Sequence, residues 1–168
     1  RGNLTDHYDP RSKVVRLSNA VYNGYSLAAL GVAAHETGHA LQHATHYLPL
    51  NIRHSLVPVA NIGSRLGLPL AIIGIFLFQS QLMLQAGIIL FAGAVLFQVV
   101  TLPVEYNAST RALALLEKGG YLGRREVDGA KEVLNAAALT YVAATLVALL
   151  HLVRLLLLAS RFSGGRRR

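Results

Sequence analysis

The sequence predicts a mainly α-helical integral membrane protein with a short β-hairpin and about three transmembrane helices. Hydrophobic residues make up 53% of the 168 positions and charged residues 14%, whereas a soluble domain has roughly 25% charged residues. Residues 66–104 include no charged residue and no histidine, which is enough for two spans of about 20 residues each. Residues 133–153 form another apolar run without Asp, Glu, Lys or Arg. A soluble domain that buried such helices would need to be larger than this chain.

The N-terminal part of the chain is expected to combine a hairpin with a helix. Residues 1–25 form the hairpin region, because Asp9-Pro10 favours a turn and the pair Val14-Val15 favours a strand. Ser26 is a suitable N-cap for an Ala- and Leu-rich helix over 26–46. We expect residues 1–168 to form a single domain.

The remaining elements follow from the apolar runs. A transmembrane hairpin is expected at 62–104, divided by the polar patch Gln79-Ser80-Gln81. A charged helix should then cover 105–118, because Gly119-Gly120 ends the helical pattern. A third transmembrane helix is expected at 133–158, followed by a disordered tail at 161–168.

Charge and cysteine content narrow the partners and the metal ligands. The net charge is +8, but the basic residues are scattered beside apolar runs, which favours contact with a lipid bilayer over nucleic acid. The chain has no cysteine, so any metal must be held by histidine or carboxylate side chains.

The segment His35-Glu36-Thr37-Gly38-His39 has the pattern H-E-x-x-H on the expected helix. Residues four apart lie on one helix face, where two imidazoles can share one zinc ion at about 2.0–2.1 Å. Glu36 can then act as general base toward a water on the metal. A chance match on an ordinary helix is the alternative, and the placement of the motif on a strongly predicted helix makes it the weaker one.

A third ligand is not fixed by the motif. The metzincin pattern fails because Gln42 and Thr45 stand where Gly and His are needed. Glu105 is the best candidate, because the transmembrane hairpin returns the chain to the side of the two histidines. Other candidates that no hairpin ties to the bilayer surface are Glu117, Glu126, Asp128 and Glu132. Exposed helix ends are expected for His43, His46 and His54.

Several separated segments resemble one family. DHYDPRSKVVRLS, VAAHETGHALQHA, LPVEYNAS and AALTYVAA occur in this order and resemble the bacterial membrane-bound neutral zinc metallopeptidases of the YugP-like group. The resemblance covers about residues 4–158. It implies a multi-pass protein of the bacterial cell (inner) membrane, and a further transmembrane helix before Arg1.

The chain is also distantly similar to the HtpX and Ste24 type of membrane proteases. This similarity implies a zincin-like site in which Glu105 is the third zinc ligand. Those proteases have an aspartate where Ser109 stands, so a carboxylate behind the ligands is absent there. Asn107 or Ser109 is then expected to orient a zinc-bound histidine.

The expected function is zinc-dependent hydrolysis of peptide bonds in peptide or protein substrates, including membrane-associated ones. Arg111 and Tyr141 are candidates for stabilising the oxyanion, and each also has a structural reading, as a helix charge or as packing in a span. The alternatives are a non-catalytic metal-binding protein or a membrane scaffold, neither of which needs Glu36. Basic residues near the site place the site on the cytoplasmic side by the positive-inside rule. With three spans, the basic tail at 161–168 would lie outside, which conflicts with the same rule.

Overall fold

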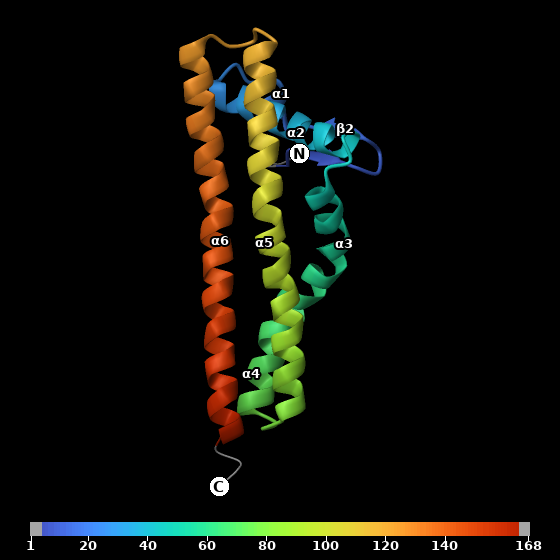
Figure 1. Cartoon of the computed structure of the whole chain (residues 1–168), viewed down its shortest axis with the longest axis vertical. Helices are drawn as coiled ribbons and strands as arrows, with labels where there is room; N and C mark the ends of the chain where they lie inside the picture. The colour runs from blue at the N-terminus through green and yellow to red at the C-terminus, as the bar shows by residue number, and fades with distance from the viewer. Residues whose placement is uncertain (1–4, 165–168) are drawn as a thin grey trace. The chain divides into compact units, whose positions relative to one another are not determined.

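The structure is a computed structural model that describes residues 5–164, with side chains to Phe162. It is mainly helical, as predicted, with one two-stranded antiparallel sheet (Figure 1). Three of the described helical stretches are long and apolar enough to cross a membrane: Leu48–Phe76, Gln81–Lys118 and Arg124–Phe162. The predicted fold class is therefore confirmed.

The chain divides into two compact units. The first comprises residues up to Asn51 together with Leu102–Thr140, and the second comprises Ile52–Thr101 together with residues from Tyr141 onward. All residues of the H-E-x-x-H motif and Glu105 belong to the first unit. The site can therefore be described within the first unit alone.

The predicted hairpin is present in the first unit. Strand β1 (His7–Asp9) pairs antiparallel with β2 (Val14–Arg16), with Tyr8 opposite Val15. The Asp9 carboxylate closes the turn by accepting from the Ser12 hydroxyl at 2.7 Å and the backbone N–H of Arg11 at 2.9 Å. These two bonds hold the pKa of Asp9 below its ordinary value.

The helix that carries the motif is α2 (Leu27–Ala44), close to the predicted limits of 26–46. The Ser26 hydroxyl accepts from the backbone N–H of Ala29 at 3.1 Å, which satisfies one of the free donors at the helix start. The helix packs against α1 (Asn19–Tyr22) and against both strands of the hairpin. Its buried face includes Gly38, His39 and Gln42.

Gly38 allows α2 to approach the helix α5 (Gln81–Lys118) closely within the first unit. A Cβ at position 38 would collide with the backbone oxygen of Ala108 and would lie 3.0 Å from its carbonyl carbon. Glycine is less favourable than alanine in a helix by about 1 kcal/mol. That cost is explained here by the backbone contact, which brings the motif next to the helix carrying Glu105.

The first arm of the transmembrane hairpin begins earlier than predicted, and all of it from Ile52 onward belongs to the second unit. The helical stretch starts with α3 (Leu48–Ile62), passes Pro58, continues through a π-helical segment η1 (Gly63–Gly67) and ends with α4 (Leu68–Phe76). Gly67 lies against α5, where a Cβ would be 2.7 Å from the backbone nitrogen of Phe91. The unit has a small core of Ala71, Leu84 and Leu155.

Two other boundaries also differ from the sequence-based expectation. The predicted charged helix at 105–118 is not a separate element but the continuation of α5, because Pro103 is accommodated inside the helix. The last helix, α6 (Arg124–Gly164), starts before the apolar run at 133–158 and extends beyond it. The predicted disordered tail is therefore wrong for 161–164, which are helical, and residues 165–168 lie outside the described residues.

Candidate metal centre

His35 and His39 lie one turn apart on α2 and face the same direction. Their ring centroids are 4.7 Å apart, and the rings meet edge to face at 86°. His39 is buried and His35 is partly buried. The helical spacing of the motif therefore brings the two imidazoles together as the sequence indicated.

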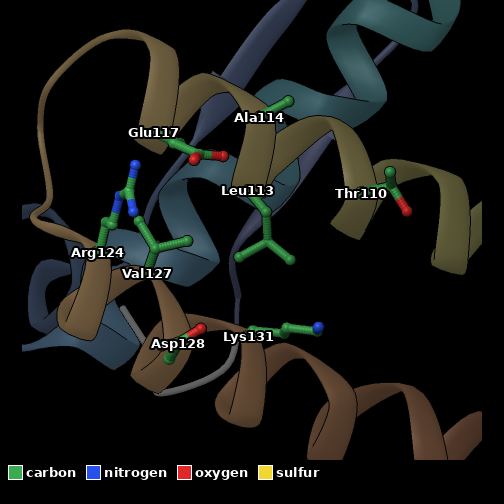
Figure 2. A pocket seen from close by; sticks show the side chains of 8 residues that line it. All are labelled: Thr110, Leu113, Ala114, Glu117, Arg124, Val127, Asp128 and Lys131. Carbon is green, nitrogen blue, oxygen red and sulfur yellow. The ribbon is translucent and has the colours of Figure 1, made fainter.

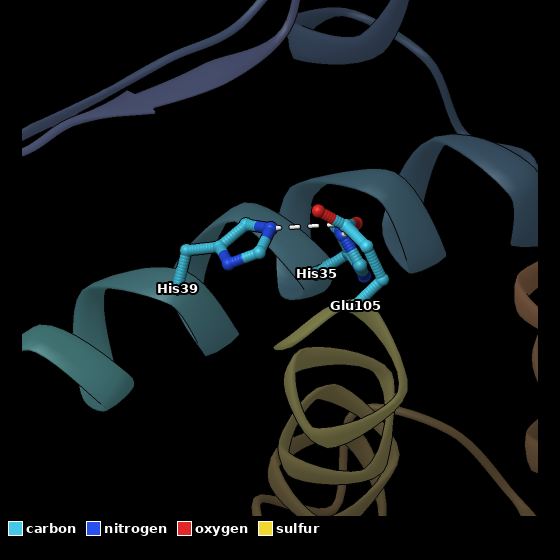
Figure 3. A group of neighbouring side chains, drawn as sticks. All are labelled: His35, His39 and Glu105. Atoms are coloured by element: carbon cyan, nitrogen blue, oxygen red, sulfur yellow. Dashed lines mark hydrogen bonds and ion pairs between the residues drawn. The ribbon is translucent and has the colours of Figure 1, made fainter. Parts of the chain in front are cut away.

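Glu105 approaches both rings from α5. Its Oε2 lies 3.1 Å from Nε2 of His35 and 3.7 Å from Nε2 of His39 (Figure 3). The side chain is almost fully buried, and a buried carboxylate is costly unless opposite charges or donors surround it. Glu105 is thus directed into the motif by the packing of α5 on α2.

The donor set of this cluster fits a zinc ion. One ligand atom from each of His35, His39 and Glu105 lies within 4.8 Å of the others. Ligand atoms bonded at 2.0–2.1 Å to a tetrahedral ion are about 3.3 Å apart, a value between the two distances from Glu105. Among the described residues, no other group of three or more histidine or acidic side chains converges in this way. Three ligands would leave one position open.

The electrostatics of the site favour a positive charge between the rings. Burial of His39 by itself lowers the pKa of its imidazole, but the hydrogen bond and charge of Glu105, with a smaller contribution from Gln42, raise it more. The net pKa of His39 is above its ordinary value. A metal ion binds the unprotonated ring, so protons compete with metal up to a higher pH, and metal binding releases them.

The outer nitrogen of each ring has its own polar neighbour. Nδ1 of His35 lies 3.1 Å from the hydroxyl of Ser109, and Nδ1 of His39 lies 3.0 Å from Oε1 of Gln42. Such contacts on the far nitrogen typically orient metal-binding imidazoles. Ser109, one of the two residues expected to do this, is in direct contact with a motif histidine, and Asn107 is hydrogen-bonded to Gln42 at 3.0 Å.

Glu36 lies between the two histidines in sequence and is only partly buried. Within residues 5–164 its carboxylate makes no hydrogen bond or ion pair with another side chain. It contributes to the electrostatic field at His39. Its carboxylate is therefore available to a water or substrate beside the histidines.

The two oxyanion candidates lie in different surroundings. Arg111 donates from Nε to Oδ1 of Asn107 at 2.8 Å, and its guanidinium lies 5.8 Å from the ring centroid of Tyr47. These contacts indicate that Arg111 holds neighbouring side chains in place. Tyr141 belongs to the second unit and is 38% exposed.

The competing histidines and acids have other surroundings. His43 accepts from or donates to the Tyr8 hydroxyl at 2.7 Å, and Glu126 accepts from the backbone N–H of Gly123 at 2.8 Å. Glu117 and Asp128 line a separate cavity of about 660 Å³ between the facing ends of α5 and α6 (Figure 2). None of these side chains is part of the cluster around Glu105.

Sequence reasoning missed Gln42. Its side chain is fully buried and contacts His39 directly. The sequence contains a signal for it, because Gln42 lies three residues after His39 and seven after His35, on the same face of the helix. A polar residue on a buried helix face needs partners there, and His39 lies one turn before Gln42 on that face.

The chain matches the family model described as "Putative neutral zinc metallopeptidase" over residues 1–160. It belongs to this metallopeptidase family. It is also 50% identical over 166 residues to a protein of Bacillus subtilis (strain 168) named "Putative membrane protease YugP", a match that covers 99% of this chain and 72% of that protein. No solved structure matches the chain. The resemblance to YugP-like metallopeptidases is thus confirmed, and the family agrees with the donor set at His35, His39 and Glu105.

Proposed function

We propose that the protein is a zinc-dependent endopeptidase of the membrane, in which His35, His39 and Glu105 hold one zinc ion. The observation that carries the proposal is the convergence of these three side chains from two helices that are far apart in sequence. The family match and the partly exposed Glu36 beside the cluster support hydrolysis over storage of metal. A bound zinc ion supplies Lewis acidity, which lowers the pKa of a water molecule toward 7 and polarises a carbonyl group.

In this mechanism Glu36 carries both proton transfers, and other residues orient the metal ligands. Glu36 accepts a proton from the attacking water, whose oxygen forms a bond to the carbonyl carbon of the scissile peptide. As the carbon–nitrogen bond breaks, Glu36 returns that proton to the leaving amine. His39 and His35 keep their orientation through Gln42 and Ser109. Arg111 stays a candidate for the oxyanion, although its contacts favour a positioning role.

Metal removal tests the proposed function. We expect the purified protein in detergent to carry one zinc per chain and to cleave casein. A chelator should abolish cleavage, and stoichiometric zinc should restore it, because His35, His39 and Glu105 form the only converging ligand group among residues 5–164. Zinc binding without any cleavage of casein or of membrane-protein substrates would favour a non-catalytic metal-binding protein. A chain without zinc would favour a membrane scaffold.

We further propose that the protein is a multi-pass protein of the bacterial cell membrane, with the site on the cytoplasmic side. The three apolar helical stretches support a location in the bilayer. The basic residues around the first unit support a cytoplasmic site. The absence of native cysteines allows a direct test. A cysteine in place of the exposed Lys118 should react with an impermeant maleimide in inverted vesicles but not in intact cells. Labelling in intact cells would reverse the orientation.

A further inference from the structure

A series of hydrogen bonds connects Arg111 to His39. Arg111 determines which atom donates and which accepts in the first of them. An arginine side chain has donors and no acceptor. Arg111 donates from Nε to Asn107 at 2.8 Å, so the oxygen of the Asn107 amide must face it. The same Oδ1 also accepts from Nε2 of Gln42 at 3.0 Å. Asn107 therefore acts as an acceptor toward both of its partners.

The orientation of the Gln42 amide follows from its own hydrogen bonds. Its amide nitrogen donates to Oδ1 of Asn107 and, at 2.8 Å, to the backbone oxygen of Val104. A backbone oxygen can only accept, so this second contact fixes the same orientation independently. Both hydrogens of the amide are thereby used. The amide oxygen is left to face Nδ1 of His39 at 3.0 Å.

An amide oxygen opposite Nδ1 determines which nitrogen of His39 carries the hydrogen. Because Oε1 of Gln42 can only accept, Nδ1 of His39 must donate. In the neutral ring, Nε2 then has the lone pair, and Nε2 is the atom that lies 3.7 Å from Glu105. That is the tautomer a metal ligand needs at this atom.

The Nδ1 atom of His35 has a different kind of neighbour. Its Nδ1 meets the hydroxyl of Ser109 at 3.1 Å, and a hydroxyl can both donate and accept. Ser109 can therefore accompany either tautomer of His35. The Nδ1 atoms of the two motif histidines are thus supported differently, and only that of His39 faces a group that accepts and cannot donate.

We propose that Gln42 and Asn107, anchored by Arg111, are positioning residues that lock His39 as the neutral tautomer with its lone pair on Nε2. The inference rests on the proposed function only in that it assigns this lone pair to zinc. The complete burial of Gln42 strengthens the lock, because an amide that reversed its orientation would oppose its nitrogen to the Nδ1 donor and its oxygen to two acceptors. Burying a polar group without a hydrogen-bond partner is unfavourable, so the reversed orientation is disfavoured.

Three variants test the donor and acceptor roles in this series of hydrogen bonds. Gln42→Met keeps the length and volume of the side chain but removes the acceptor for His39. Asn107→Leu removes the acceptor for Gln42 at similar size. Asn107→Asp is the matched control, because a carboxylate still accepts from both Gln42 and Arg111. Thermal unfolding and far-ultraviolet circular dichroism identify any variant that fails to fold.

The first readout is the zinc dissociation constant, measured by competition with a chromophoric chelator. We expect Gln42→Met to weaken zinc binding by about 10–100-fold, the range found when a partner behind a metal-binding histidine is lost. Asn107→Leu should weaken it in the same direction, whereas Asn107→Asp should stay within about threefold of the wild-type protein. Equal affinities for the aspartate and leucine variants, or unchanged affinity in folded Gln42→Met, would overturn the proposal.

The second readout does not depend on zinc or on activity. Long-range proton–nitrogen spectra of the metal-free protein at about pH 9, where imidazoles are neutral, distinguish the two tautomers by their nitrogen shifts. The signal lost in His39→Gln identifies His39. We expect hydrogen on Nδ1 in the wild-type protein and a mixture of tautomers in Gln42→Met. Hydrogen on Nε2 in the wild type would disprove the lock, while a wild-type protein that has the expected tautomer but binds no zinc would disprove the proposed function alone.

Discussion

Glu36→Gln is expected to leave zinc binding intact while lowering the rate of casein cleavage by about 10²–10⁴-fold. The carboxylate is not among the three converging ligand groups, so its removal takes away no ligand. Glutamine has nearly the same size but cannot accept the proton of the attacking water. The measurement is the ratio of kcat/KM in the variant and the wild-type protein, with zinc content determined on the same samples.

A matched control for this substitution is Glu117→Gln, which makes the same chemical change on the exposed cavity wall between α5 and α6. It should keep both activity and zinc. If Glu36→Gln cleaves casein as fast as the wild-type protein does, Glu36 is not the base and the proposed mechanism is wrong.

Glu105→Ala is expected to cause the largest loss of zinc among single substitutions of acidic residues. It removes one of the three proposed ligands and leaves the two histidines without the buried carboxylate that now faces both of them. The decrease in zinc affinity should exceed the 10–100-fold that loss of a partner behind a ligand typically causes. Competition with a chelator of known affinity measures it, and activity should decrease in parallel.

The controls are Glu117→Ala and Asp128→Ala, which replace acids that line the separate cavity (Figure 2). Both should keep stoichiometric zinc. A Glu105→Ala protein that retains zinc, together with an Asp128→Ala or Glu117→Ala protein that loses it, would show that another carboxylate is the third ligand.

The elements that local signals specify were predictable from the sequence. Ser26 and the Ala- and Leu-rich run after it predicted α2 to within about two residues, because capping and propensity act over a few neighbouring positions. Asp9 likewise indicated the turn of the hairpin, and its carboxylate closes that turn. The choice of Glu105 relied on a longer-range argument, that a transmembrane hairpin returns the chain to its starting side.

Features that depend on packing between distant segments were not predictable. Nothing local to Pro103 indicates that α5 continues through it, or that α3 continues past Pro58, because surrounding helices decide whether such a residue breaks a helix. Two partners of Gln42 are distant in the sequence, Val104 by 62 residues and Asn107 by 65, beyond any spacing rule. Arg111 looked suited to an oxyanion because of its charge, and its contacts with Asn107 and Tyr47 became visible only in the folded chain.

X-ray absorption at the zinc edge of the purified, tag-free protein tests the central claim most directly, because it reports the atoms that surround the metal. We expect a four-coordinate ion with two imidazole nitrogens and oxygen ligands at about 2.0–2.1 Å. One oxygen should come from Glu105, so its substitution by alanine should change the shell, whereas Glu36→Gln should leave the number of imidazoles at two. A six-coordinate shell of oxygen alone, or a shell with three or more imidazoles, would contradict a zinc site built from His35, His39 and Glu105.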